Sequence, residues 1–382
     1  MNHLYSFSTA SKIIAGPKSI EQIVSVVEDS GVRNTLILTD PGVYAAGLTK
    51  KAESLLRSSN ATVDVVKGVL CEPPVTLVDE LHAQIGRKQY DMYIGIGGGS
   101  TLDMTKLLAA RTQNHEPMHT YLGTDKITKK GLPTLLIPTT AGTGSEVTPN
   151  AIVTLEDQQL KVGIVSRHLL PDYVIADPHL TLTLPPHVTA ATGMDAFIHS
   201  LESYISNKAN PLGDTFALHS MRLIGRSILR AYHEPENTEA RHQMLIGSLL
   251  GGMALTASGT AAVHALAYPL GGRYSIPHGV ANSMLLVPVL EYNLDSCAER
   301  LSHVAEVMAI GGSRPSSDAL LDSIKQMVLE LKIPRYLDDF GVSRSDVSEL
   351  AVAASKVERL LRNNPKPMCI PDIEAVYSSL FR

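Results

Sequence analysis

The chain has 382 residues, a formal net charge of -5, 44% hydrophobic residues and 19% charged residues. This length exceeds the ~250–300 residues at which a single hydrophobic core usually stops growing, so two domains are expected. The composition is that of an ordinary globular protein, and the acidic balance offers no basic footprint for nucleic acid or an anionic membrane. We therefore expect neither partner.

Three cysteines, Cys71, Cys297 and Cys369, occur at unrelated positions and form neither a disulfide framework nor a CxxC motif. The first residues, MNHLYSFSTASKIIAGP, combine no basic region with a long apolar run, so no secretory signal is expected. These features favour a reducing cytoplasm. The apolar run 245–263 is rich in Gly, Ala, Ser and Thr, which predicts a buried helix rather than a membrane span.

From residue 20 to about 180, short apolar runs alternate with amphipathic stretches. Runs at 35–40, 61–66, 91–97 and 134–140 predict strands, and the periodicity of 43–58 and 75–88 predicts helices between them. This alternation is typical of a parallel sheet with helices on both faces.

Beyond Pro185 the strand-like runs nearly vanish. Segments 195–206, 217–233 and 297–309 have helical periodicity and are rich in helix-forming residues. We therefore predict an α/β domain over residues 1–184 and an all-α domain over residues 185–382.

The sequence GIGGGSTLDMTK places Gly97, Gly98 and Gly99 between a predicted strand and a predicted helix. Glycines let the backbone approach a pyrophosphate closely, and the free N–H groups of a helix start attract its charge. We expect the helix to open at Ser100, with Asp103 completing a capping box. A triple glycine taken by itself is also typical of a tight turn.

Two further segments have the chemistry of a dinucleotide site. Asp40, at the end of a strand in LTDPG, can accept hydrogen bonds from ribose hydroxyls, although an Asp before Pro41 is also typical of a plain turn. PTTAGTGSEVT, at 138–148, is dense in hydroxyls and glycines directly after a strand, as a phosphate-gripping loop requires. Asp40 precedes the glycines at 97–99 in the chain, whereas in the usual Rossmann fingerprint the acidic residue follows the glycines.

A candidate metal site lies in the second half of the chain. Asp195 and His199 are four residues apart, so on a helix they share one face. His264 follows the charge-free run 245–263, and His278 lies in a turn between Pro277 and Gly279 that can aim its side chain inward. One carboxylate and three imidazoles suit Fe(II) or Zn(II) better than Ca(II) or Mg(II). Spacing alone leaves open whether Asp195 and His199 form a surface pair instead.

Four segments together resemble the iron-containing alcohol dehydrogenase family: GGGS at 97–100, PTTAGTGSEVT at 138–148, GMDAFIHSLESY at 193–204 and PHGVANS at 277–283. They occur in the family's order and cover nearly the whole chain. The resemblance implies a Rossmann-like, NAD-binding domain followed by an all-helical metal-binding domain, as in dehydroquinate synthase, with the active site in the cleft between them. It implies that the metal ligands are Asp195, His199, His264 and His278.

The resemblance also implies which residues contact the dinucleotide. Asp40 would accept bonds from the ribose and repel a 2′-phosphate, which favours NAD(H) over NADP(H). The implied cofactor contacts are Asp40, Gly97, Gly98, Gly99, Ser100, Thr139, Thr140, Thr143, Ser145, Lys161 and Leu180.

The implied activity is hydride transfer between NAD(H) and a primary alcohol or short diol and its aldehyde, assisted by Fe(II), with Zn(II) as the alternative metal. A homodimer or larger homo-oligomer is typical of the family. Many members have a second histidine four residues after the third ligand, where this chain has Tyr268. A tyrosine is a poorer base at neutral pH, so Tyr268 is a candidate either for proton relay or for shaping the pocket.

Three alternatives remain at this level. The chain can be a lyase of the dehydroquinate synthase type, although that relative uses different ligands. It can be an NAD-binding protein with a structural metal. It can reduce an acidic substrate: a hydroxy acid if Arg273 meets the acidic group, although an exposed loop arginine is the plainer interpretation, or maleylacetate, whose reductases are a side branch of the family that often lacks the full ligand set.

Overall fold

The computed structural model describes residues 4–86, 88–157, 160–313 and 315–382. The chain divides into two compact units, one of residues 8–183 and one of residues 184–382 together with residues 4–7. Phe7 packs on Phe216, with ring centroids 5.0 Å apart. The start of the chain thus joins the second unit, whereas the predicted division assigned it to the first.

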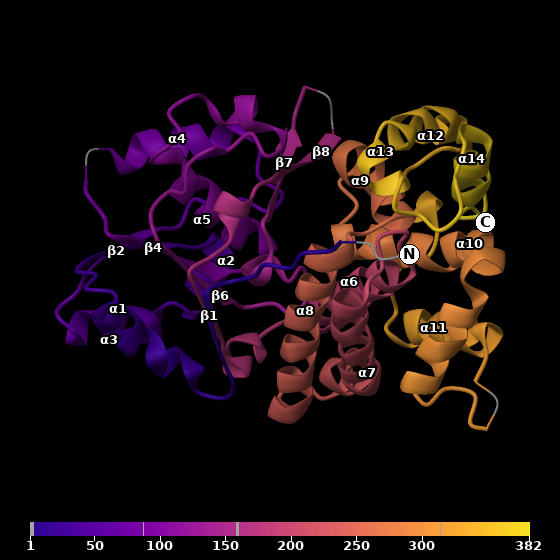
Figure 1. The fold of residues 1–382 in the computed structure, drawn as a ribbon, viewed down its shortest axis with the longest axis horizontal. Coiled ribbons are helices and arrows are strands. Elements are labelled where there is room, and N and C mark those ends of the chain that lie inside the picture. Colours follow the sequence, from indigo (N-terminus) through magenta and orange to yellow (C-terminus); the bar gives the residue numbers. More distant parts are fainter. Residues whose placement is uncertain (1–3, 87, 158–159, 314) are drawn as a thin grey trace. The chain divides into compact units, whose positions relative to one another are not determined.

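The first unit is built on a six-stranded parallel sheet with strand order β1-β9-β6-β4-β2-β3 (Figure 1). Its strands are β1 (Lys12–Ala15), β2 (Asn34–Leu38), β3 (Thr62–Val66), β4 (Met92–Gly97), β6 (Thr134–Pro138) and β9 (Tyr173–Ala176). The four predicted strands correspond to β2, β3, β4 and β6. The four-residue strands β1 and β9 are too short to show a sequence period and were not predicted.

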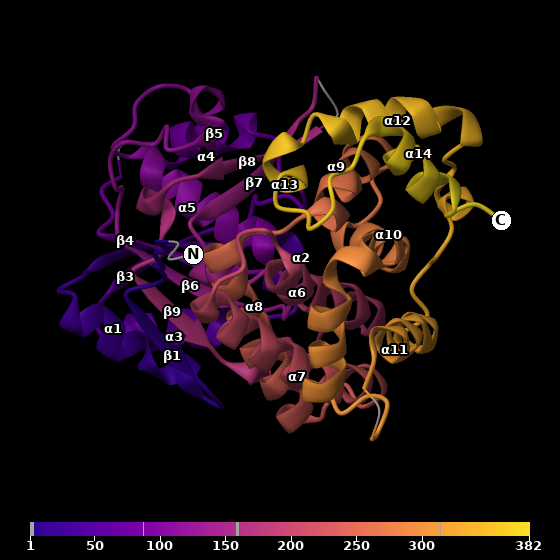
Figure 2. The same ribbon diagram turned by 45° about the vertical axis from the view of Figure 1, so that its right-hand side comes forward.

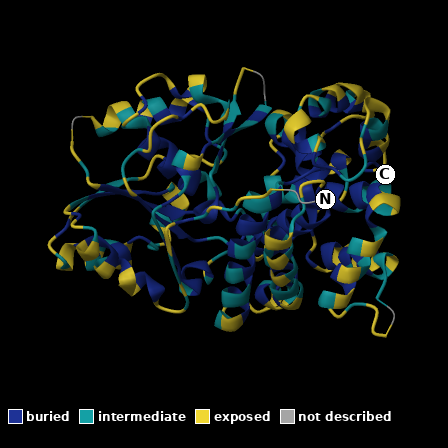
Figure 3. Cartoon of the chain, in the orientation of Figure 1, coloured by how far each residue is buried: buried dark blue, intermediate teal, exposed yellow. Residues whose placement is uncertain are grey.

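Alternate side chains of the central strands point to opposite faces of the sheet, as the pleat requires. Leu36 and Leu38 belong to a core shared with α4 (Thr76–Ile85) and α5 (Gly99–Arg111). Ile37 and Ile94 belong to a second core shared with α1 (Ile23–Asp29) and α3 (Lys50–Ser58). Helices therefore cover both faces, as predicted; α1, α3 and α4 have exposed residues on their outer sides, whereas no residue of α5 is exposed (Figure 3).

The helix predicted over 43–58 is interrupted. It forms α2 (Pro41–Ala45) and α3, separated by a turn in which Gly47 has a φ of 74°. A second, three-stranded sheet was not predicted; it has the order β5-β8-β7, and β7 and β8 are antiparallel. These strands are β5 (Gly123–Thr124), β7 (Asn150–Leu155) and β8 (Leu160–Val165).

The second unit contains helices and no strand within the described part of residues 184–382. The helices are α6 (Pro186–Ile205), α7 (Pro211–His233), α8 (Thr238–Ser258), α9 (Ala262–Tyr274), α10 (His278–Val307), α11 (Ser317–Glu330), α12 (Val347–Ser355), α13 (Glu358–Leu361) and α14 (Ile370–Ser378). α6 packs against α7, α8 and α10 (Figure 2). Its residues 193–205 are all buried. α6 is therefore the core helix of this unit.

The apolar run 245–263 spans the end of α8 and the start of α9, and none of its residues is exposed. Its predicted burial is confirmed, but the helix breaks at Gly259, where φ is 72°. Among the described residues, no single helix is long and apolar enough to cross a membrane; α8 and α9 meet that criterion only as a pair, bent by 107°.

Candidate functional site

Helix α6 carries two of the four predicted ligands. Asp195 and His199 lie one turn apart on it, and both are buried, with 3% and 5% of their surface exposed. α6 begins with Pro186, after Pro185 as its N-cap; proline suits the first turn because the N–H that it lacks would have no helical partner there. The predicted common face of Asp195 and His199 therefore points into the protein, and the surface-pair alternative is wrong.

The other two ligands come from the starts of two helices. His264 lies in the first turn of α9, and His278 is the first residue of α10, with Pro277 as its N-cap. The structure brings all four residues together: one ligand atom from each lies within 4.8 Å of the others. Residues up to 83 positions apart in the sequence thus form one cluster.

The ligand atoms converge on a common point. The Nε2 atoms of His264 and His278 each lie 3.7 Å from Oδ1 of Asp195. The amide nitrogen of Asn282 donates to Oδ1 of Asp195 at 2.7 Å and lies 3.2 Å from each of those two Nε2 atoms. Three acceptor atoms therefore face one position, and such a buried carboxylate–imidazole set fits Fe(II) or Zn(II).

The electrostatics agree with a cation site. Burial alone raises the pKa of the Asp195 carboxyl, but the positive charges of His199, His278 and His264 when protonated, together with the hydrogen bond from Asn282, lower its pKa below the ordinary value. His199 stacks on His264 with ring centroids 4.6 Å apart. Asp195 is therefore held as the charged form that a metal requires.

The sequence analysis missed two residues of this centre, Asn282 and Glu202. Asn282 lies four residues after His278 on α10, so the two share a helix face. Glu202 lies three residues after His199 on α6, and its carboxylate is 2.6 Å from Nδ1 of His264. Both were inside the quoted motifs, and helical spacing from a known ligand is the signal that points to them.

Tyr268 lies on α9 one turn after His264, as its spacing predicts, and it is buried. Its ring centroid is 6.3 Å from that of His278. The structure thus places Tyr268 beside the cluster, while its part in proton relay stays a prediction.

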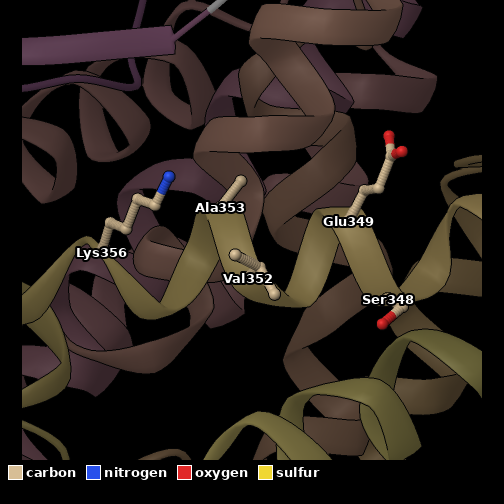
Figure 4. Close-up of a pocket in the computed structure, with 5 residues that line it drawn as sticks. All are labelled: Ser348, Glu349, Val352, Ala353 and Lys356. Carbon is tan, nitrogen blue, oxygen red and sulfur yellow. The ribbon is translucent and has the colours of Figure 1, made fainter.

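Arg273 is bound to another side chain. Its guanidinium pairs with Glu349 of α12 at 2.5 Å, and this hydrogen bond raises the pKa of Arg273. Glu349 also lines a shallow surface pocket of about 250 Å³, together with Val352 and Lys356, in which the Glu349 and Lys356 side chains stand apart along one helix (Figure 4). None of the four clustered ligands lines this pocket, so it is not part of the metal centre.

In the first unit, the predicted nucleotide-binding residues follow the carboxyl ends of adjacent parallel strands. Asp40 follows β2, Gly98 follows β4 and Thr139 follows β6, and these strands are neighbours in the order β6-β4-β2. Leu180 follows β9, which lies beside β6, and packs in the core below. Ligands of open parallel sheets bind at this edge.

The glycine loop packs against the hydroxyl-rich loop. A Cβ on Gly99 would lie 2.5 Å from the Thr143 side chain, and a Cβ on Gly98 would lie 3.4 Å from that of Thr140. The N–H of Thr139 donates to the carbonyl of Gly97 at 3.0 Å. The structure therefore brings these predicted residues together, and glycine is needed at position 99 for the close approach.

The predicted capping box is wrong. α5 begins at Gly99, and no side chain caps it. The Oγ of Ser100 instead accepts from the N–H of Glu72, whose carboxylate holds Lys161 at 2.5 Å. The carboxylate of Asp103 accepts from the N–H of Ile152 at 2.9 Å. The side chains of Ser100 and Asp103, which local spacing assigned to a capping box, are instead hydrogen-bonded to residues that are distant in the sequence.

A buried network fixes the hydroxyl-rich loop on α5. The Ser145 hydroxyl donates to Asp103 at 2.5 Å, so it is turned inward. The Lys106 ammonium, with a fully buried side chain, pairs with Asp103 at 2.9 Å and donates to the carbonyls of Ser145, at 3.0 Å, and Asn150. Ser145 therefore acts here in positioning the loop.

Asp40 caps α2 by accepting from the N–H of Val43 at 2.9 Å.

These observations define a class of protein. A parallel sheet with a glycine-rich helix start at its carboxyl edge is the arrangement that binds dinucleotides. A buried carboxylate–imidazole cluster is the arrangement that binds a catalytic transition metal. Together they indicate a metal-dependent dehydrogenase.

Comparison with known proteins gives the family. The model of the iron-containing alcohol dehydrogenase matches residues 10–178, and that of the Fe-containing alcohol dehydrogenase family, C-terminal, matches residues 189–381. The long-chain-alcohol dehydrogenase 1 of Geobacillus thermodenitrificans is 38% identical over 95% of this chain and 93% of its own. The chain belongs to the iron-containing alcohol dehydrogenase family, and it is an oxidoreductase of alcohols and aldehydes.

Solved structures agree with this assignment. A crystal structure of a 1,3-propanediol oxidoreductase has a TM-score of 0.95 and 34% identity, and covers 99% of this chain and 100% of its own. The sulfoacetaldehyde reductase of Bifidobacterium kashiwanohense, in complex with NAD⁺, has a TM-score of 0.90 and 29% identity, covering 99% of both chains. The predicted fold class, an α/β domain followed by an all-helical domain, is confirmed.

Proposed function

We propose that this chain transfers a hydride between NAD(H) and a primary alcohol or short diol and its aldehyde, using Fe(II), or Zn(II), held by Asp195, His199, His264 and His278. The observation that carries the proposal is the convergence of these four ligand atoms within 4.8 Å. The expected position of the active site between the two domains remains a prediction.

When bound, a divalent metal supplies Lewis acidity that polarises an aldehyde carbonyl or lowers the pKa of an alcohol. The chain's own residues hold this site rigid. Asp195 supplies a negative charge in a buried place, and the amide of Asn282 donates to it at 2.7 Å and fixes its orientation. Tyr268, buried beside His278, narrows the neighbouring space and has a hydroxyl that can pass a proton.

The first unit supplies the cofactor site. The N–H groups at the start of α5 attract a pyrophosphate, and Gly98 and Gly99 leave room for it to approach the backbone. Asp40 lies at the same edge and would accept from ribose hydroxyls while repelling a 2′-phosphate. NAD(H) is therefore the cofactor we propose, in agreement with the NAD⁺ complex of the sulfoacetaldehyde reductase.

An uncharged substrate is favoured over an acidic one. Arg273 is paired with Glu349, so it is not held ready for a carboxylate or sulfonate. Among the relatives, the 1,3-propanediol dehydrogenase of Klebsiella pneumoniae, at 35% identity, agrees with this choice, whereas the sulfoacetaldehyde reductases are named for an acidic substrate, so the choice rests on the Arg273–Glu349 pair. Hydride transfer is favoured over lyase chemistry by family membership.

We also propose a homodimer or larger homo-oligomer in the cytoplasm, with no nucleic-acid or membrane partner. The net charge of -5 supports the absence of a polyanion-binding surface. The three cysteines are free, which suits a reducing compartment. Light scattering on the purified chain measures the assembly state.

The test is NADH absorbance with a panel of alcohols and aldehydes, on metal-stripped protein with Fe(II), Zn(II) or no metal added back. We expect turnover only with metal. His199→Ala should abolish it, whereas His187→Ala, at an exposed histidine on the same helix, should leave it unchanged. Protein that binds both metal and NAD⁺ without any turnover would refute the dehydrogenase proposal and favour a structural metal.

A further inference from the structure

Glu202 is a buried carboxylate with three hydrogen-bond donors around it. It lies on α6 and is 1% exposed. Oε1 accepts from the N–H of Val263 at 2.6 Å, and Oε2 accepts from the N–H of Ala261 at 3.0 Å and lies 2.6 Å from Nδ1 of His264. Within the described residues, its ion-pair partner is His264 rather than a lysine or arginine.

The carboxylate determines which ring nitrogen of His264 is protonated. A carboxylate only accepts hydrogen bonds, so Nδ1 of His264 must donate the proton between them. In the neutral ring, Nε2 then keeps its lone pair. That Nε2 is the atom that faces Asp195 at 3.7 Å and Asn282 at 3.2 Å. Glu202 thus orients the electron pair of His264 toward the centre of the cluster.

Glu202 also fixes the position at which α9 begins. The chain turns sharply between α8 and α9, and the N-cap of α9, Ala261, has no side chain able to cap the helix. Glu202, which lies on α6, takes the place of a capping side chain because its carboxylate accepts hydrogen bonds from the N–H groups of Ala261 and Val263. His264 follows directly, so the helix that carries Asp195 also fixes the backbone of His264.

We propose that Glu202 is a positioning residue of the metal centre, which holds His264 in its Nδ1–H form and fixes the start of α9 so that Nε2 is presented to the metal. The proposal rests on the metal centre of the proposed function. Carboxylates that bind the second nitrogen of a metal-ligating histidine typically contribute 10- to 100-fold to metal affinity.

The deciding variant is Glu202→Gln in the full chain. Glutamine has the same shape, but its amide has one acceptor atom, so at least one of the three donors would face an NH₂ group. We expect Zn(II) affinity, measured by competition with a chromophoric chelator, to fall roughly 10- to 100-fold. The Co(II) absorption spectrum should change as well, because the geometry at His264 changes.

The matched control is Tyr377→Phe. The buried Tyr377 hydroxyl donates to the carbonyl of Leu266 at 2.6 Å, so its removal perturbs the same helix, α9, without touching a ligand. We expect a lower unfolding temperature, with wild-type Zn(II) affinity and Co(II) spectrum. A merely structural role of Glu202 predicts that both variants lose stability and neither loses metal affinity, and this result would overturn the proposal.

A second measurement needs no variant of Glu202. Nitrogen-15 NMR of histidine-labelled, Zn(II)-loaded wild-type protein reports the tautomer of each ring, and the His264 signal is identified by its loss in His264→Gln. We expect the proton on Nδ1; a proton on Nε2 would overturn the proposal even if Glu202→Gln failed to fold. Wild-type protein that binds neither Zn(II), Co(II) nor Fe(II) is a separate outcome, which refutes the proposed function itself.

Discussion

Gly279 is the glycine of the PHG motif, and its replacement by alanine tests how closely α10 must approach α6. A Cβ on Gly279 would lie 2.2 Å from the carbonyl oxygen of Ala191 and 2.7 Å from its carbonyl carbon. Both are backbone atoms of α6, which cannot swing aside as a side chain does. Restoring an ordinary contact of 3.4 Å requires α10 to move about 1.2 Å from α6 at this point.

The movement falls on the metal centre because His278 directly precedes Gly279 and Asp195 is on α6. Metal sites tolerate about 0.2 Å in ligand distance, so a shift near 1 Å should separate His278 from the other ligands. We expect Gly279→Ala to lower turnover roughly 100-fold, as a displacement of this size does. Overpacking should also cost about 1–3 kcal/mol of stability, partly offset by the better helix propensity of alanine.

The assay combines Co(II) absorption, chelator competition for Zn(II) and NADH turnover. The control is Gly225→Ala, in the same unit on α7, where the nearest atoms to the new Cβ all belong to the Met308 side chain, with its terminal methyl at 2.4 Å. That flexible side chain can move, so metal affinity and turnover should remain at wild-type values. If Gly279→Ala retained the wild-type Co(II) spectrum and turnover, the argument from close backbone approach would be wrong.

Three further predictions concern the first unit. Lys106→Met should lower the free energy of unfolding in urea by about 3–5 kcal/mol, because it leaves Asp103 and several carbonyls buried without their partner. Lys88→Met, which removes an exposed ion pair, should lower it by about 0–1 kcal/mol, and equal losses in the two variants would contradict this account. Burial raises the pKa of Glu146 to about 7 from 4.5, so its contribution to stability is fully present below pH 4.5 and is lost as pH rises through 7. Glu146→Gln should therefore flatten the rise in urea sensitivity between pH 5 and 8, and an unchanged pH profile would show that Glu146 does not titrate there. Asp40→Asn keeps the cap on α2 but removes the charge, so the ratio of NADP⁺ to NAD⁺ affinity, measured by calorimetry, should rise; a constant ratio would place the ribose elsewhere.

Local sequence patterns were sufficient to predict a strand or a helix face where apolar or functional residues recur with the regular period of that element. The alternating apolar runs predicted β2, β3, β4 and β6, and the spacing of Asp195 and His199 predicted their common helix face. The family motifs named four ligands that the structure brings within 4.8 Å. These features depend on residues within a few positions of one another, so the sequence shows them directly.

Local patterns failed where a distant partner competes for the same group. Ser100 and Asp103 have the spacing of a capping box, but Glu72 and Ile152 take their hydrogen bonds instead. The break of the apolar run 245–263 lies at Gly259, a residue type that commonly ends helices, but the start of the next helix is held by Glu202 of α6, which binds the N–H groups of Ala261 and Val263. In both cases contacts that lie far away along the chain stabilise the observed conformation.

The amino-acid sequence by itself determined the class of fold and the family and named the candidate metal ligands, because periodicity, residue chemistry and motif order are local properties. Only the tertiary structure decided which atoms converge. The 3.7 Å separations in the cluster, the hold of Glu202 on His264 and the contact of Gly279 with Ala191 all join different helices. Such contacts depend on how buried helices pack, and packing is a property of the whole core rather than of any one segment.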